Sequence, residues 1–389
     1  MTPTAQLPIV LVLLDGLGGP AAAAVARTPR LDALTVRGAC GLLAPAVGDD
    51  EGGRSRFAVL GYRPGELPGR AVLEARGHGL AVEADTVYAL AALRPGVLRG
   101  GERWCVGRAE PRQASLAARI FDVLDRLDAD VRVMPIDVGR AIVAFEGLAS
   151  DRLGDGGPAG DGPLVPVRPL QRGPLAASAA RRVEEWRAAA AVVLQRRRLN
   201  ALSLRWFGRP RRVPPLCERH GLHGPLVAAS PAMLGLGDVL GLEVVEDRPG
   251  VDPAADLRRR LDVAARALRD GASLAVCHSD AVLAAAATGE AGAVRDAVRR
   301  VDRALGRLDR APFDGAVVCA AAGPVLHAPD LPAPPLVVRG PGMAPDEVTR
   351  FGPGAARHGR LGRVDAPALL PLLAALARGE RLAALDPIG

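Results

Sequence analysis

The chain has 389 residues, of which 49% are hydrophobic, and this is enough apolar material for two domains or one large α/β domain. Its net charge of +7 is carried by arginine alone, since no lysine occurs, and the arginines are interspersed with acidic residues. A nucleic-acid-binding stripe is therefore not expected. The apolar run at residues 8–14 is too short for a membrane span or a signal peptide. We expect a cytoplasmic protein, and its five cysteines show no CxxC spacing that would indicate zinc or disulfides.

That first apolar run, PIVLVLL, is apolar at both odd and even positions, which predicts a central strand of a parallel sheet with both faces buried. Asp15 follows at the carboxyl end of this strand, where open α/β sheets bind their ligands. The glycines at positions 16, 18 and 19 would let a metal ion or a phosphate approach the backbone. An Asp-Gly turn without any ligand is the alternative interpretation.

A short helix is predicted from Pro29, followed by a second strand near residues 38–43. Residues 48–56 (GDDEGGRSR) form a polar, glycine-rich loop, which is where a sheet-based phosphotransferase would carry a nucleophile. From about residue 70 the sequence pattern changes. The elements predicted in this part include a helix at 114–127, strands at 131–135 and 141–145, and a helix at 176–198. This part is predicted to form a smaller α+β unit.

Strand-like and helix-like segments alternate again after residue 200 and include an amphipathic helix at 291–308. Alternating units of this kind indicate a mostly parallel sheet that is covered by helices on both faces. The predicted fold class is therefore α/β, with an additional smaller α+β domain.

The order of several segments resembles the archaeal-type cofactor-independent phosphoglycerate mutases of the alkaline phosphatase superfamily. The matching pieces include LVLLDGLGG, TPRLDALTVRGACGLLAP and LGYRPGE. The resemblance implies an alkaline-phosphatase-like three-layer core at residues 1–72 and 188–389, with an inserted domain at residues 73–187. It also implies phosphoryl transfer between the 2- and 3-positions of phosphoglycerate through a phosphoserine, assisted by two manganese or zinc ions.

The family's functional positions are only partly retained in this sequence. Asp15 falls on the amino-terminal metal aspartate, whereas the nucleophilic serine falls on Gly52, with Ser55 as a weak alternative three residues out of register. The family's last histidine falls near Ala328, close to His327. A lysine of the family's substrate pocket is matched by Leu234. Four further metal-ligand positions carry apolar residues: Leu283, Ala287, Ala320 and Ala321.

These departures favour a protein that has lost metal-dependent phosphoryl transfer and needs no metal cofactor. Such a protein would bind a small phosphorylated or carboxylated metabolite through Arg70, Arg205 and His278, in a regulatory or scaffolding role. Each arginine could instead form an ordinary surface ion pair. Protein partners are not indicated by the sequence.

Two other hypotheses remain open at this point. The chain could be an active mutase or a related phosphotransferase with relocated residues, using Asp15, Ser55, His278 or Asp280. It could also be a structural protein that binds no ligand. Ser279 and Asp280 are, in addition, typical of a helix N-cap.

Overall fold

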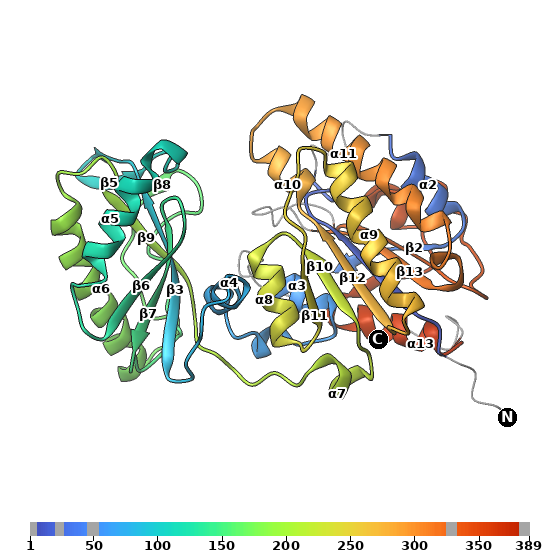
Figure 1. The fold of residues 1–389 in the computed structure, drawn as a ribbon, viewed down its shortest axis with the longest axis horizontal. Coiled ribbons are helices and arrows are strands. Elements are labelled where there is room, and N and C mark those ends of the chain that lie inside the picture. The colour runs from blue at the N-terminus through green and yellow to red at the C-terminus, as the bar shows by residue number, and fades with distance from the viewer. Residues whose placement is uncertain (1–5, 20–26, 45–53, 324–332, 381–389) are drawn as a thin grey trace. The chain divides into compact units, whose positions relative to one another are not determined.

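The computed structural model describes residues 6–19, 27–44, 54–323 and 333–380. Contacts divide the chain into a first unit, Met1–Leu67 with Val213–Gly389, and a second unit, Pro68–Arg212. Figure 1 shows the elements of both units, coloured by residue number. Within the described residues, no helix has the length and apolar character needed to cross a membrane.

The first unit is built on a large, mostly parallel sheet. Its eight strands stand in the spatial order β11 (Glu243–Glu246), β10 (Pro225–Ala228), β12 (Leu274–Ser279), β1 (Ile9–Leu14), β13 (Val317–Ala322), β14 (Pro335–Arg339), β2 (Ala39–Ala44) and β15 (Gly362–Asp365). Neighbouring strands run parallel except where β14 pairs with β13 and with β2. The mostly parallel sheet predicted from the sequence is confirmed.

Helices cover this sheet on both faces, so its central strands β1, β12 and β13 are buried along their whole length. Every residue of β1 is buried, as the unbroken run at residues 8–14 predicts. Helices α2 (Pro29–Val36), α9 (Pro253–Arg269) and α11 (Ala291–Leu305) share one apolar cluster with β1, β12 and β13. The remaining helical segments of this unit are α3 (Arg54–Val59), η2 (Pro64–Glu66), α7 (Leu216–His220), α8 (Pro231–Val239), α10 (Ala281–Ala286), η4 (Gly306–Asp309), η5 (Phe313–Gly315), α12 (Pro353–Ala356) and α13 (Ala366–Ala377).

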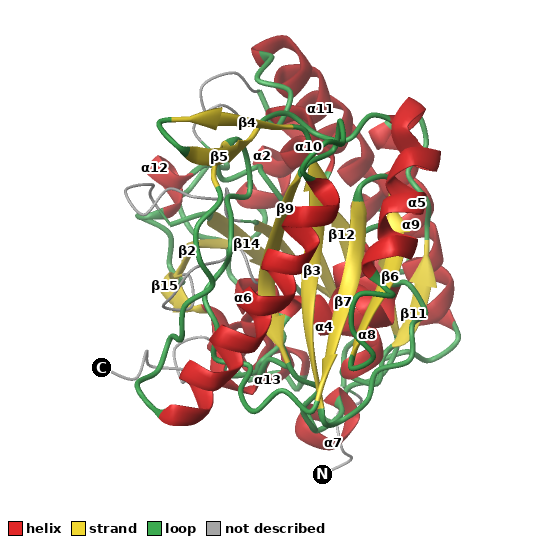
Figure 2. Cartoon of the chain, turned by 90° about the vertical axis from the view of Figure 1, so that its left-hand side faces the viewer, coloured by secondary structure: helices red, strands yellow, loops and turns green. Residues whose placement is uncertain are grey.

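The second unit has an antiparallel sheet in the order β6 (Val131–Asp137), β7 (Arg140–Glu146), β3 (Thr86–Arg94) and β9 (Ala201–Gly208). Helices α5 (Ala114–Leu124) and α6 (Pro174–Leu194) pack on one face, where Figure 2 shows α6 beside the strands. Helix α4 (Arg70–Gly77) packs on the other face. The remaining elements of this unit are η3 (Pro111–Gln113) and a small sheet of β4 (Gly96–Arg99), β5 (Glu102–Cys105) and β8 (Gly162–Pro163).

The boundaries between the units differ from the expected divisions after residues 72 and 187. The structure divides the chain after Leu67 and after Arg212. Helix α4 belongs to the second unit because its apolar side packs on β3 and β7, and β9 belongs there because it pairs with β3. The helix at 176–198 therefore leads into the last strand of the smaller unit before the chain returns to the large sheet.

Two buried thiols predict how alkaline pH acts on the first unit. Cys277 and Cys319 lie on β12 and β13, and burial raises the pKa of each to about 12. A thiol in the unfolded chain has a pKa of about 8.5. The higher pKa of the folded state means that the neutral thiols contribute their full stability below that pH, and that this contribution is lost as the pH rises toward 12. Each thiol should lower the free energy of unfolding by about 1.4 kcal/mol per pH unit in this range.

Urea unfolding between pH 8 and pH 11 under reducing conditions measures this dependence. The variant Cys277→Ala/Cys319→Ala should show a shallower decline than the wild type, whatever its stability at pH 7. The exposed Cys217 provides the control, since Cys217→Ala should leave the slope unchanged. Equal slopes in all three proteins would contradict the prediction.

Candidate functional site

Asp15 lies at the carboxyl end of β1, between the ends of the two neighbouring strands. Its backbone N–H donates to the Ser279 carbonyl at 2.8 Å, and the Gly323 N–H donates to the Leu14 carbonyl at 2.7 Å. β1 is parallel to both β12 and β13, so the carboxyl ends of three strands meet here. The position is the one predicted for a ligand site in an α/β sheet.

The Asp15 carboxylate is buried and is contacted by two cationic or proton-donating side chains. Arg56 donates to Oδ2 from Nε at 2.9 Å and from Nη2 at 2.5 Å. His278 Nε2 lies 2.7 Å from the same oxygen, and it donates, since a carboxylate only accepts. Burial alone would raise the pKa of the Asp15 carboxyl, but the Arg56 charge and His278 outweigh it and hold that pKa well below its usual range.

Arg56 comes from α3, the helix that follows the glycine-rich loop. Ser55, the alternative nucleophile, precedes it in the same helix and is buried. Gly52, at the family's nucleophile position, and His327 both lie outside the described residues. The described part of this loop therefore places a guanidinium against Asp15.

The substituted ligand positions lie close to Asp15. Leu283, in α10, donates its backbone N–H to the Asp15 carbonyl at 3.2 Å. Ala320 and Ala321 lie on β13 and are buried, and Ala287 ends α10. The positions that the resemblance matches to metal ligands thus carry a leucine and alanines, at α10 and on β13.

Two glycines allow this close packing around Asp15. Gly16 has a φ of +85°, and a Cβ there would come within 2.5 Å of the Leu283 nitrogen. A Cβ on Gly323 would lie 2.2 Å from Asp15 Oδ1. The glycine turn therefore admits the Asp15 carboxylate and α10 at distances that no side chain would tolerate.

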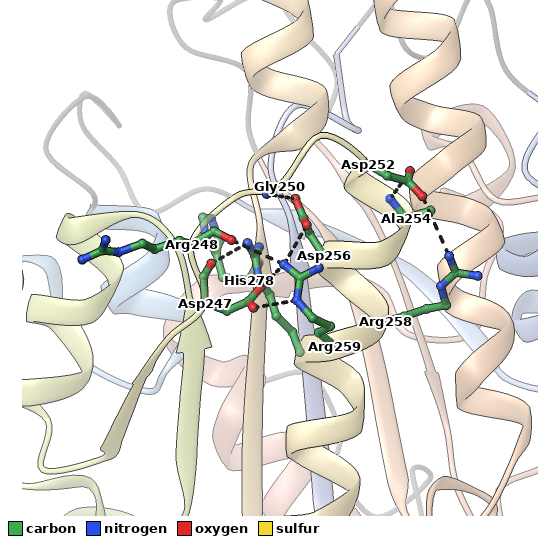
Figure 3. A network of polar contacts seen from close by, with 10 residues as sticks. Asp247, Arg248, Gly250, Asp252, Ala254, Asp256, Arg258, Arg259 and His278 are labelled. Carbon is green, nitrogen blue, oxygen red and sulfur yellow. Dashed lines mark hydrogen bonds and ion pairs between the residues drawn. The ribbon is translucent and has the colours of Figure 1, made fainter.

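The backbone of His278 is contacted by a buried arginine, Arg260. Arg260, on α9, donates from Nη1 to the His278 carbonyl at 2.6 Å and from Nε to Asp247 at 2.9 Å. Asp247 also pairs with Arg259, which in turn reaches Asp256. Figure 3 shows this network beside His278. The end of β12 is thereby tied to α9.

The two other predicted binding residues, Arg70 and Arg205, lie together in the second unit. The guanidinium carbons of Arg70 and Arg205 lie 3.8 and 4.7 Å from the centre of the Trp206 ring. Arg205 Nε donates to Asp155 at 3.0 Å, and Asp155 also accepts the Trp206 N–H at 2.7 Å. Arg70 contacts the buried Glu74 at 3.3 Å. Both arginines are therefore ion-paired as well as stacked.

Trp206 lies at an irregularity of β9. Tyr88 pairs with Gly208 and Leu90 with Arg205, so β9 carries one extra residue across this interval. Trp206 has a φ of +58°, which non-glycine residues rarely adopt. Such bulges redirect side chains and are common beside binding sites. At this bulge the indole contacts two arginines that lie far apart in the sequence, Arg70 and Arg205.

Comparison with known proteins places these features in a family. A model of 2,3-bisphosphoglycerate-independent phosphoglycerate mutase matches residues 36–200. A mutase of this name from Methanopyrus kandleri is 30% identical over 395 residues, which cover 93% of this chain and 92% of that protein. The chain belongs to this family. A mutase of the family from Methanoculleus marisnigri is 28% identical, over 94% of this chain and 96% of that protein.

A solved structure agrees with the mutase fold. A cofactor-independent phosphoglycerate mutase from Thermoplasma acidophilum has a TM-score of 0.61 and 24% identity, covering 96% of this chain and 100% of that one. The family resemblance found in the sequence is therefore confirmed over nearly the whole chain.

The expectation that the chain uses no cofactor is wrong, because the mutase family to which it belongs consists of metal-dependent enzymes. The described side chains near Asp15 offer few ligands for metal ions. His278 Nδ1 is buried and has no hydrogen-bond partner within the described residues, so it offers one donor atom. In the described part of the chain, no three His, Cys, Asp or Glu side chains lie together in a group that could hold a metal ion. The described residues thus do not assemble the family's two-metal centre.

Sequence reasoning missed Arg56 and Trp206. Arg56 belongs to the segment 48–56, in which a nucleophile was expected. The loss of the family's other metal-ligand positions was the available signal that Asp15 would need a cation of the protein, such as this arginine. Trp206 follows Arg205 directly, but nothing in the sequence indicates its bulge.

Proposed function

We propose that this chain is a mutase-family protein that binds a phosphorylated three-carbon acid and no longer carries out the family's phosphoryl transfer. The observation that carries this proposal is the Asp15 carboxylate, engaged by Arg56 and His278 in the interior. In the family, metal ions supply charge neutralisation of the phosphoryl oxygens and activation of the serine. Here the aspartate at that place is committed to a guanidinium and an imidazole.

The residues needed for the attacking group support the same proposal. The serine position is Gly52, and the weak alternative Ser55 lies within a short helix and is buried. A nucleophile must reach the phosphorus in line and must be deprotonated by a nearby base or metal. A glycine has no group to attack with, so phosphoryl transfer through this position is not expected.

The arginine pair around Trp206 supports retained binding. Guanidinium groups bind carboxylates and phosphates through paired N–H donors, and phosphoglycerate carries both anions. The guanidiniums of Arg70 and Arg205 both lie close to the centre of the Trp206 ring in the second unit, at 3.8 and 4.7 Å, so they can engage anions of one small molecule. The relatives are named as phosphoglycerate mutases, which gives the substrate class.

Calorimetric titration with 3-phosphoglycerate, together with a turnover assay, tests both halves of the proposal. We expect binding without turnover, with or without added Mn²⁺ or Zn²⁺. Arg70→Ala should weaken binding at least tenfold, which is about 1.4 kcal/mol, and Glu74 would keep its contact with Arg140 at 3.5 Å. Arg205→Lys should weaken binding as well, because an ammonium lacks the planar fork.

The exposed Arg132 of the same unit is the matched control, and Arg132→Ala should bind like the wild type. Turnover that is abolished by Asp15→Ala would overturn the loss of catalysis and favour an active mutase. Absence of binding to 3-phosphoglycerate and to 2-phosphoglycerate would overturn the binding half and favour a purely structural role.

A further inference from the structure

Helices α2 and α11 lie side by side in the first unit (Figure 1), and a buried carboxylate joins them. Asp302, on α11, accepts the backbone N–H groups of Arg30 at 3.1 Å and of Leu31 at 3.0 Å. It therefore satisfies the free N–H groups at the start of α2. Its oxygens are committed to the backbone, and any additional anion at this place must be bound by side chains.

A row of arginines follows one side of α11 beside this contact. Arg295, Arg299 and Arg303 are spaced four residues apart, so they project from the same side of the helix, and all three are exposed. Like charges at this spacing repel one another and destabilise a helix. No carboxylate partner is found for these three among the residues that the structure describes.

Other arginines of the same helix and its surroundings are paired. Arg300 contacts Asp296 at 2.7 Å and Asp252 at 3.3 Å. The lack of partners on the 295–299–303 row is therefore a property of this side of the helix. Among the described residues, the only carboxylate beside this row is that of Asp302, which is already engaged by the start of α2.

The row faces a hollow of about 590 Å³ that is also lined by Arg27, Arg30 and Asp302. Small-molecule sites commonly measure about 300–1,000 Å³. Arg30 lies 3.9 Å from Asp309, a long ion pair between partly exposed side chains, and Arg27 has no partner among the described residues. Five guanidinium groups therefore surround one hollow that contains a single, already engaged carboxylate.

We propose that this hollow, lined by Arg27, Arg30, Arg295, Arg299 and Arg303, binds a small anion that carries two or more linked phosphate groups. Successive arginines of the row are separated by about 6 Å along the helix, and the whole row spans about 12 Å. One phosphate can reach neighbouring guanidiniums only, whereas linked phosphates can contact the entire row. This site is separate from the Asp15 cluster and from the Trp206 arginines.

Calorimetry and thermal unfolding with tripolyphosphate test this site, with orthophosphate at equal ionic strength as the comparison. EDTA in every sample removes any contribution from metal chelation by tripolyphosphate. We expect tripolyphosphate to bind and to raise the melting temperature, with orthophosphate at least tenfold weaker. The variant Arg295→Ala/Arg299→Ala/Arg303→Ala should lose binding at least tenfold.

The control removes the same charge from exposed arginines of the second unit, in Arg181→Ala/Arg196→Ala/Arg198→Ala, and should bind like the wild type. Equal losses in both triple variants, or equal effects of the two phosphates, would show a general charge effect and overturn the site. Tighter binding of a single-stranded 20-mer oligonucleotide to the wild type, lost in the first triple variant, would also overturn it in favour of a nucleic-acid surface. Arg299→Gln alone, which should weaken binding severalfold, keeps the test valid if the triple variant misfolds.

Discussion

Replacing Asp15 by alanine is expected to lower the free energy of unfolding by about 3 kcal/mol. The Asp15 and His278 side chains are each 2% exposed, and the Arg56 side chain is 14% exposed. Removing the carboxylate would take away the charge that Asp15 supplies to the Arg56 guanidinium and the acceptor of the His278 N–H. Urea unfolding followed by circular dichroism measures the change. Tryptophan fluorescence is unsuitable, since Trp104, Trp186 and Trp206 all lie in the second unit.

A double-mutant cycle with Arg56 separates the ion pair from other effects of Asp15. The double variant Asp15→Ala/Arg56→Met should be more stable than Asp15→Ala, because the guanidinium that has lost the Asp15 carboxylate is removed as well. Asp280→Ala is the control, since Asp280 lies at the start of α10 and makes no capping hydrogen bond; it should change the stability little. A double variant that is no more stable than Asp15→Ala would contradict a stabilising role for this ion pair.

The core sheet was predictable because burial on both faces leaves a direct mark in the sequence. The run at residues 8–14 could only be a covered strand, and β1 has every residue buried. Strand β3 alternates between two apolar clusters, with Val87, Ala89 and Leu93 in one and Tyr88 and Leu90 in the other. The domain boundaries were less accurate, because the pairing of β9 with β3 joins residues more than one hundred positions apart.

The site was predicted only where a residue stands at the end of a recognisable strand. Asp15 and His278 both follow that rule, and the structure brings them to 2.7 Å. Arg56 belongs to a loop whose path the sequence does not define, so its pairing with Asp15 depends on tertiary placement. The stacking of Arg70 and Arg205 on Trp206 likewise depends on a bulge with no residue signature.

Replacing Arg260 by alanine is the second change with a large expected effect, again about 3 kcal/mol. Arg260 is 3% exposed and connects Asp247 with the His278 carbonyl. Its removal would leave a buried carbonyl without a donor and would weaken the hold on the strand end that carries His278. The hydrogen bond between the His278 ring and Asp15 should weaken as well. The NMR chemical shifts of the His278 ring would report this change.

Arg259 is the matched comparison for this prediction. It lies next to Arg260 on α9 and pairs with Asp247 and Asp256, but 49% of its side chain is exposed. Exposed ion pairs contribute little to stability because water screens both charges, so Arg259→Ala should shift the unfolding midpoint far less than Arg260→Ala. Arg260→Lys should fall between them, because lysine keeps the charge but cannot reach Asp247 and the His278 carbonyl through one planar group. Equal effects of Arg259→Ala and Arg260→Ala would show that burial of Arg260 does not determine the strength of the network, and that the end of β12 is held by other contacts.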